Sequence, residues 1–415
     1  MSLTIAAVLL LALAHSATAN CSDSKTLQEH ASALDTLLRE KAIPFWLDTV
    51  DFEYGGYFLN HDLIEGRGET ADKFIITQAR MVWTFSWAHT AGFSTAEADL
   101  LDAARVGFEY LSAKLYDPTN GGYYWSASQE GTPLDTTKHL QGQAFVIIGF
   151  SEYYRASGDE TALDLALDLF MKIKEKAVDS DSSFGGLIED FTEDWVPISE
   201  PLFSGPAGTR GFKTANGVMH MIEALTALYD ISKNSEVGEM LADLVDNLAP
   251  NYYPPKAPED AVAFRTYDGE AAGTLPVERY GHFVEYTWIR HEALQVLGRG
   301  VSWAFFDRYV RHSLKNGIDS STGGLLQDGV LDWWPQTEFM KLVAVDTREK
   351  GKYQDELVTI LDLWECSFVD PVVGISVGAI SPEGVSINNQ LAGQWKSGFH
   401  EVRGMGAVIK AFKTQ

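Results

Sequence analysis

The sequence predicts an all-α fold in which six helical hairpins close into a ring, an (α/α)6 barrel with short β-hairpin loops. Two observations lead to this prediction. A turn motif built on aspartate and glycine recurs along the chain, and the segments between its copies carry apolar residues at helical spacing. A chain of 415 residues, of which 45% are hydrophobic, can bury a core of the required size.

The turn motif consists of an aspartate followed by one or two glycines. Its copies run from Asp51 to Gly56, Asp117 to Gly122, Asp181 to Gly186, Asp319 to Gly324 and Asp370 to Gly374. Successive aspartates lie 66, 64, 138 and 51 residues apart, and 138 is close to two periods with one degenerate copy near residues 250 to 270. Repeats of this length indicate stacked units that cannot bury their apolar faces alone, so six units are expected to share one core.

Each unit is expected to hold about two helices, because residues 162–173, 219–229, 284–297 and 338–345 carry apolar side chains every three or four positions. The aspartates are expected to form the turns rather than to bind metal, and the glycines to supply positive φ angles. No GxGxxG or GxxxxGK[ST] motif follows a predicted strand. Nothing therefore indicates a dinucleotide or P-loop site.

The first nineteen residues are expected to be a secretory signal that is cleaved after Ala19. An apolar stretch from Leu3 to Ala14 is followed by a triplet of small residues that ends at Ala19. The alternative, a membrane anchor, needs about 20 apolar residues, and this stretch is shorter. Residues 20–415 would then form one secreted barrel domain.

The composition restricts the partners that the protein can have. With 58 acidic and 32 basic residues, the formal net charge is -26, which repels nucleic acids and anionic membrane surfaces. A small molecule is the expected partner, and a homodimer is possible. The two cysteines, Cys21 and Cys366, are too few for a disulfide scaffold. One disulfide between them is possible in a closed ring, since the ring would bring the two ends of the chain together.

Three segments place a histidine three residues from a charged residue, which puts both side chains on one face of a helix. The pairs are His220 with Glu223, His282 with Glu285, and His400 with Arg403. One such pair is more often structural than functional, but three pairs in different units indicate a shared site. No zinc site is indicated, because HExxH is absent and catalytic zinc normally has three protein ligands at defined spacings.

These three segments, together with Lys73 to Ser86, resemble the motifs of the N-acylglucosamine 2-epimerase family, which includes cellobiose 2-epimerases and mannose isomerases. The likeness extends from about residue 40 to 410 and also includes Gly55 to Phe58, Lys213 to Asn216, and Trp333 to Glu338. Four such motifs in this order are specific evidence for the family, whereas a single one of them would not be. The sequence departs from the family at Tyr280, Tyr286 and Phe399, which puts the choice of substrate in doubt.

The resemblance implies an (α/α)6 barrel that acts on a free reducing sugar without a metal or another cofactor. His282 and His400 would be the acid/base pair that flanks carbon 2, with Glu285 orienting or tuning His282, and His220 would assist ring opening or bind the substrate. The other residues expected to bind substrate are Arg80, Asn216, Trp334, Trp395, Glu338 and Arg403. Glu338 could equally hold a neighbouring helix, and Arg80 could equally form an internal ion pair.

Histidine suits this chemistry because imidazole, with a pKa of about 6.5, can take and return a proton near neutral pH. Two histidines on opposite faces of a planar enediolate would give an epimerase, and one histidine working on a single face would give an aldose–ketose isomerase. Both remain open. A glycoside hydrolase would need paired carboxylates, such as Glu285, Glu338 or Asp190, and would leave the histidines unexplained. A non-catalytic sugar-binding protein would not need the acid/base histidines either.

Overall fold

A computed structural model describes residues 25–68, 71–95, 98–180, 182–200, 210–272 and 280–413. In this part of the chain, six helices surround a common axis and six others cover them. The inner helices are α4 (Ile75–Thr90), α6 (Leu140–Ser157), α8 (Ala215–Ser232), α10 (Tyr280–Val296), α12 (Trp333–Lys350) and α14 (Gly398–Phe412). The outer helices are α2 (Leu27–Leu37), α5 (Leu100–Tyr110), α7 (Glu160–Lys176), α9 (Ser235–Asp243), α11 (Trp303–Asn316) and α13 (Gln354–Leu363). The (α/α)6 barrel is thus confirmed.

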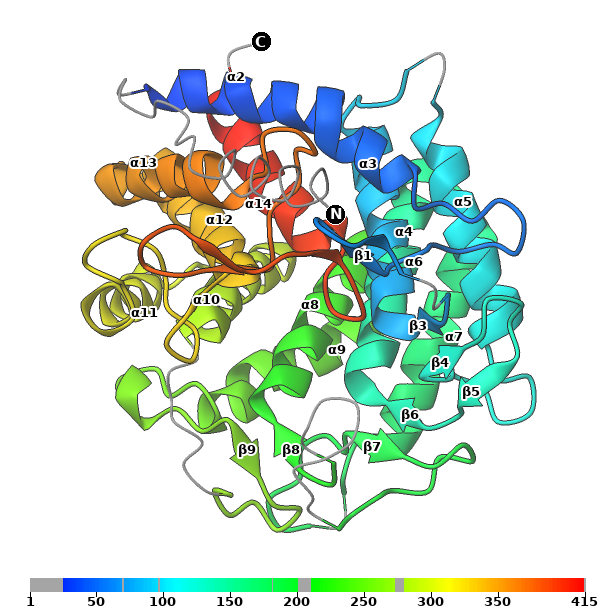
Figure 1. Cartoon of the computed structure of the whole chain (residues 1–415). Helices are drawn as coiled ribbons and strands as arrows, with labels where there is room; N and C mark the ends of the chain where they lie inside the picture. Colours follow the sequence, from blue (N-terminus) through cyan, green and yellow to red (C-terminus); the bar gives the residue numbers. More distant parts are fainter. Residues whose placement is uncertain are drawn as a thin grey trace, which may run out of the picture.

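The ring is closed by the last helix. Each inner helix packs against the next, and α14 packs against both α4 and α2, so the end of the chain meets its beginning (Figure 1). Four outer helices, α2, α5, α9 and α13, continue into a π-helical turn: η1 (Leu38–Ala42), η2 (Leu111–Leu115), η3 (Leu244–Leu248) and η6 (Trp364–Phe368). After η1 the chain continues as α3 (Ile43–Leu47).

The inner and outer helices differ in how much of their surface is buried. In α6, residues 140–151 are buried without interruption, so the helix is covered on all sides. In α7 the buried residues are Ala162, Ala166, Leu169, Phe170 and Ile173, whose spacing of three and four forms a single stripe. The four segments predicted to be helical lie within α7, α8, α10 and α12, except that Leu297 follows the end of α10.

One backbone hydrogen bond recurs six times and marks the six units. The donor and acceptor pairs are Phe58 and Thr49, Tyr124 and Leu115, Ile188 and Ala177, Val262 and Tyr252, Leu326 and Gly317, and Val377 and Phe368. The pair at residues 252 and 262 is the degenerate copy that the sequence predicts near residues 250 to 270.

The third copy of the turn motif begins at Asp179, not at Asp181 as the sequence suggests. The Asp179 amide donates to the Gly186 carbonyl, as the Asp51 amide does to Gly56. This loop is two residues longer than the first, so counting back from the glycines selects the wrong aspartate. Asp181 itself lies outside the described residues.

The aspartates of the motif form turns, as predicted, and three of them also bind a buried lysine. Asp51 Oδ1 accepts hydrogen bonds from the amides of Glu53 and Tyr54, while its Oδ2 binds Lys73 Nζ at 2.7 Å. Two equivalent ion pairs join Asp117 to Lys138 at 2.7 Å and Asp179 to Lys213 at 2.6 Å. Each lysine lies just before an inner helix, so the ion pair attaches the start of that helix to the preceding turn.

Short strands precede most of the inner helices and form small sheets near their N-terminal ends. The strands are β1 (His61–Asp62), β2 (Gly66–Arg67), β3 (Lys73–Phe74), β4 (Ser126–Ala127), β5 (Pro133–Asp135), β6 (Lys138–His139), β7 (Asp190–Phe191), β8 (Lys213–Thr214), β9 (Phe264–Arg265), β10 (Leu331–Asp332), β11 (Ala379–Ile380), β12 (Ser386–Asn388) and β13 (Gln390–Ala392). The antiparallel sheets have the orders β13-β1-β2, β3-β4-β5, β10-β11-β12, β6-β7 and β8-β9. Pairing of β1 with β13 joins the first and last units a second time.

The N-terminal end of the chain is only partly described. Residues 1–19, the predicted signal, and Cys21 lie outside the described residues. Cys366 on η6 is disulfide-bonded. In the part of the chain that the structure covers, no helix is both long and apolar enough to cross a membrane.

Candidate active site

A cleft of about 500 Å³ opens at the N-terminal ends of the inner helices. Each inner helix contributes its sixth residue to a central ring at one height along the barrel axis: Arg80, Phe145, His220, Glu285, Glu338 and Arg403. His282 and His400 are the third residues of α10 and α14, and Asn216 and Trp334 are the second residues of α8 and α12. The barrel symmetry therefore brings residues from distant parts of the sequence to one end of the molecule.

His400 is bound to a glutamate behind it. Its Nδ1 lies 2.6 Å from Glu338 Oε1, and Trp288 Nε1 donates to the other oxygen of Glu338 at 2.8 Å. Burial opposes ionisation of Glu338, but Arg403 and the hydrogen bond with His400 outweigh it and hold the pKa of Glu338 well below its usual range. An ionised carboxylate can only accept, so Nδ1 carries the proton of neutral His400 and Nε2 is left with a lone pair.

The imidazole of His400 is strongly biased toward its neutral form. Burial, and next the positive charge of Arg80, lower the pKa of His400 to about 3, although the hydrogen bond with Glu338 acts in the opposite direction. Its ring also lies against the indoles of Trp333 and Trp334, with centroids 5.3 and 5.9 Å away. At neutral pH, His400 is thus a base whose position and tautomer are both set by its neighbours.

Arg403 lies at the centre of three glutamates, of which Glu285 and Glu338 are buried and Glu223 is partly buried. Its guanidinium donates to Glu338 at 2.7 Å, to Glu285 at 3.1 Å and, through a short hydrogen bond, to Glu223. Burial, and next the negative charge of Glu338, raise the pKa of Glu285 well above its usual range, which favours the neutral form of this carboxyl group. The charges of Glu223 and Glu338 are then balanced by those of Arg80 and Arg403.

Among the residues that the structure describes, two groups of side chains in and beside this ring have the spacing of metal ligands. They are His220, Glu223 and Glu285, and Glu285, Glu338 and His400. Arg403 binds a carboxylate oxygen in both groups, so its guanidinium already supplies the cation around which these carboxylates gather. The negative charge of these carboxylates is therefore balanced by a protein side chain, and a metal ion is not needed to balance it.

His220 has a similar arrangement to His400. Its Nδ1 lies 3.0 Å from Glu223 Oε2, which is the His-x-x-Glu pair seen in the sequence. Although burial would raise the pKa of Glu223, the charge of Arg403 lowers it. Burial lowers the pKa of His220, so this imidazole too is neutral and has its Nε2 available.

Arg80 is held between two aromatic rings. Its guanidinium carbon lies 4.2 Å from the centre of Phe145 and 5.5 Å from that of Phe399, and Nη1 donates to the carbonyl of Trp395 at 2.9 Å. Burial lowers the pKa of Arg80 to about 10, which leaves it cationic near neutral pH. A rigid cation that lines the cleft is suited to binding an oxygen atom that gains negative charge.

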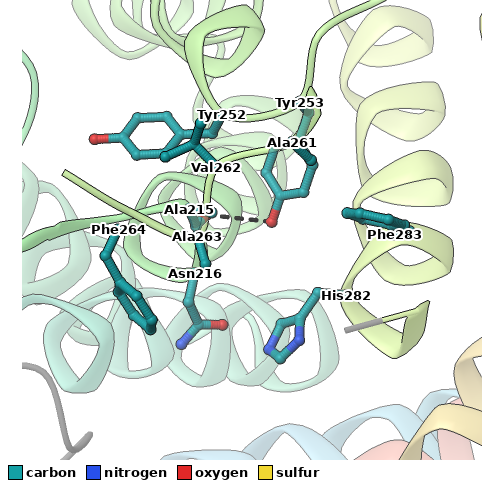
Figure 2. A pocket seen from close by; sticks show the side chains of 10 residues that line it. All are labelled: Ala215, Asn216, Tyr252, Tyr253, Ala261, Val262, Ala263, Phe264, His282 and Phe283. Atoms are coloured by element: carbon teal, nitrogen blue, oxygen red, sulfur yellow. Dashed lines mark hydrogen bonds between the residues drawn. The ribbon is translucent and has the colours of Figure 1, made fainter. Parts of the chain in front are cut away.

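His282 lies next to a small apolar pocket of about 30 Å³ at the edge of the cleft (Figure 2). In this view the side chains of Asn216 and His282 extend side by side from α8 and α10, and Tyr253 donates to the Ala215 carbonyl at 3.4 Å. The pocket has room for about one water molecule, so it does not hold a sugar. The His282 ring also contacts the Trp334 indole, with centroids 4.9 Å apart.

The structure brings most of the predicted site residues to the cleft. Its wall includes Arg80, Asn216, His220, His282, Glu285, Trp334, Trp395 and His400. Among the described residues, Glu338 and Arg403 do not line this cleft but lie behind it. They were expected to bind substrate, and that stays a prediction; in the structure their hydrogen bonds join them to His400, Glu223 and Glu285.

Other residues of the cleft were not found from the sequence. They are Gln141, Gln327, Asp328, Asp332, Asn388, Gln390 and Lys396. Several belong to the loops and strands that approach α12 and α14, where no helical spacing connects them to the histidines. The repeat could have identified Phe145, because it occupies the same sixth position as Arg80.

Known proteins are similar to this chain over most of its length. The sequence profile of the N-acylglucosamine 2-epimerase (GlcNAc 2-epimerase) family matches residues 56–255. A cellobiose 2-epimerase from Ruminococcus albus is 31% identical over 320 residues, which cover 72% of this chain and 77% of that protein. One from Bacteroides fragilis is 29% identical over 385 residues, covering 88% and 95%. The structure of cellobiose 2-epimerase from Bacillus thermoamylovorans superposes with a TM-score of 0.81 at 24% identity, over 92% of this chain and 98% of that one.

Proposed function

Because this chain belongs to the N-acylglucosamine 2-epimerase family, and is a carbohydrate 2-epimerase or isomerase, we propose that it inverts carbon 2 of a free reducing sugar through an enediolate. The observation that carries the proposal is the pair of imidazoles, His282 and His400, which line one cleft and contact the same indole of Trp334. A sugar whose reacting carbon lies between them has a base on either side.

His400 is the base with the better defined geometry. A proton on the carbon next to an aldehyde is weakly acidic and leaves only when a base is in place. Nε2 of His400 has the required lone pair, because Nδ1 is bound to Glu338. When His400 takes the proton it becomes an imidazolium beside an ionised carboxylate, and this contact stabilises the transition state.

Arg80 would stabilise the enediolate. As the proton leaves, negative charge moves to the carbonyl oxygen at carbon 1, and a cation fixed beforehand stabilises that charge without reorganisation. The same developing charge compensates for the field of Arg80 that lowers the pKa of His400 in the free protein. The site therefore favours proton removal only when a substrate can accept negative charge.

A protonated His282 would deliver its own proton to the opposite face of the enediolate, which inverts carbon 2, while His400 keeps the proton that it took. Exchange of both imidazoles with water restores the starting state. His220, held by Glu223, and the neighbouring Asn216 would bind substrate hydroxyls and assist ring opening. If only one histidine moved the proton, to carbon 1, the product would be a ketose. The presence of His282 in the cleft as well as His400 favours epimerisation over this alternative.

We propose a disaccharide with a reducing glucose unit as the substrate. Two relatives of this chain are named cellobiose 2-epimerases. A cleft of about 500 Å³ lies in the range of pockets that enclose ligands of this size. Trp395 at its wall is 39% exposed and lies 5.9 Å from the Trp125 ring, so the indole offers a face on which a second sugar can rest.

Glycoside hydrolysis is less compatible with the geometry. It needs one carboxyl group on each side of a glycosidic bond. Glu285 and Glu338 both bind Arg403, and Asp190 accepts a hydrogen bond from the Gly211 amide. Glu338 lies behind His400 rather than on the wall of the cleft, so it cannot reach such a bond.

The test is NMR spectroscopy of cellobiose and of monosaccharide aldoses with the protein in D2O. We expect the carbon 2 epimer of cellobiose to form and to carry deuterium at carbon 2. Deuterium at carbon 1 of a ketose would instead indicate the isomerase. Absence of label from every aldose in the panel would refute both.

A further inference from the structure

A second cavity, the rear cavity, lies at the other end of the barrel. It has a volume of about 250 Å³ and is formed by the C-terminal halves of α4, α10, α12 and α14. Lys410 on its rim follows His400 by ten residues of the same helix, which corresponds to roughly 15 Å along the axis. The rear cavity is therefore distinct from the cleft that binds the sugar in the proposed function.

The rim of the rear cavity carries two cations without acidic partners. Arg348 and Lys410 are exposed, and within the described ranges neither forms an ion pair. Deeper in the cavity, Lys341 binds Glu292 at 2.9 Å and Arg403 binds its three glutamates, so their charges are balanced. Glu349 also lines the rear cavity, so the opening carries two cations and one carboxylate, a local excess of positive charge in a protein with a net charge of -26.

Basic residues in the last turn of a helix complement the helix dipole, and this alone accounts for Arg348 and Lys410 being there. It does not account for the polar atoms in the wall. His291 is 3% exposed, and neither of its ring nitrogens has a hydrogen-bond partner among the described residues. An oxygen of Glu349 lies 3.7 Å from its Nε2, which is longer than a hydrogen bond.

Arg403, which also lines the rear cavity, has an unsatisfied atom of its own. Its two Nη atoms hold the glutamates, whereas Nε is buried and has no partner within the described part of the protein. His291 and Arg403 both belong to the wall of the rear cavity. Buried polar atoms without partners are uncommon in folded proteins, so a molecule in the cavity is the natural source of the missing hydrogen bonds.

We propose that the rear cavity binds a small organic anion, either a carboxylate or a phosphate monoester. Its charged group lies between Arg348 and Lys410, and its acceptor atoms approach His291 and Arg403. The apolar body of the ligand packs against Trp83 and Trp87, whose indoles are stacked 6.1 Å apart and form the opposite wall. This binding does not depend on the sugar chemistry, and its failure would leave the proposed function untouched.

The test is isothermal titration calorimetry of the protein with phenyl phosphate, benzoate and inorganic phosphate as separate probes. The double variant Arg348→Ala/Lys410→Ala removes the two rim charges, both exposed, so the barrel is expected to fold normally. Arg311→Ala/Lys315→Ala, on the outer helix α11, removes the same charge elsewhere and is the matched control.

We expect saturable binding of phenyl phosphate or benzoate at one site, weakened at least about tenfold in the rim variant and unchanged in the control. Preference between the two aromatic probes identifies the charged group, and tight binding of inorganic phosphate alone would contradict the requirement for an apolar body. No saturable binding of any probe up to roughly 10 mM, or equal binding in the rim variant, would overturn the proposal.

Discussion

Replacing Glu338 by glutamine changes one buried charge at nearly constant shape. Glu338 accepts hydrogen bonds from His400 and Arg403 at one oxygen and from Trp288 at the other. The amide of glutamine keeps one acceptor but turns an NH2 group toward one of these donors. A buried donor that faces another donor costs about 1–3 kcal/mol, so we expect a measurable but tolerable loss of stability.

The effect on turnover is expected to be larger than the effect on stability. During proton transfer His400 becomes positive, and the carboxylate charge beside it is missing in the variant. At a separation of about 4 Å and an effective dielectric constant of about 20, the lost attraction is about 4 kcal/mol, which lowers kcat by roughly 10³. KM should change much less, because Glu338 does not line the cleft. Initial rates of epimer formation, separated by chromatography, measure both constants.

Glu285→Gln is the matched control. Glu285 also binds Arg403 and is equally buried, but its raised pKa favours the neutral form. Glu285 is hydrogen-bonded to Arg403 and His400 to Glu338, so this replacement leaves the carboxylate beside His400 in place and kcat should fall by less than about tenfold. Equal losses in the two variants, or a Glu338→Gln enzyme that retains kcat within tenfold of the wild type, would refute this reasoning.

Three further predictions concern stability and substrate binding. Lys73→Met leaves the buried carboxylate of Asp51 without its ion-pair partner, so we expect the free energy of unfolding in urea to fall by about 3–5 kcal/mol. A second change, Asp51→Asn, should restore part of this loss, and no recovery would contradict the ion-pair account. Burial raises the pKa of Glu189 from 4.5 to about 8, so its contribution to stability is complete below pH 4.5 and is lost as the pH rises through 8. Glu189→Gln should therefore lose less stability than the wild type between pH 6 and 9, and parallel unfolding curves would argue against this. Trp395→Ala should raise KM for cellobiose roughly tenfold with little change in kcat, whereas an unchanged KM would remove Trp395 from the sugar site.

The fold could be predicted because each unit has two independent signals. The turn aspartates and glycines mark the loops, and apolar residues at three- and four-residue spacing mark the helices between them. The prediction was wrong at Asp181, since the loop that begins at Asp179 is longer than its counterparts and spacing alone does not reveal an insertion.

Spacing within a helix could place His220 beside Glu223, because residues three apart share a face. It could not show that Glu338 binds His400, since these side chains come from different helices and lie 62 residues apart. The residues that form the other walls of the cleft could not be predicted from the sequence either. Asp328, for example, lies in a tight turn with a φ of 51°, and no periodic pattern connects that turn to the barrel axis.

The central claim is that two imidazoles act on opposite faces of one carbon atom. It is tested most directly by exchange of the carbon 2 proton with D2O, measured by NMR for each epimer in turn with His282→Asn and His400→Asn. Circular dichroism and thermal unfolding would establish that both variants are folded. We predict that each variant still exchanges the proton of one epimer but not of the other, and that the two variants have opposite preferences. The same preference in both variants, or exchange of both epimers by either one, would contradict the two-base account.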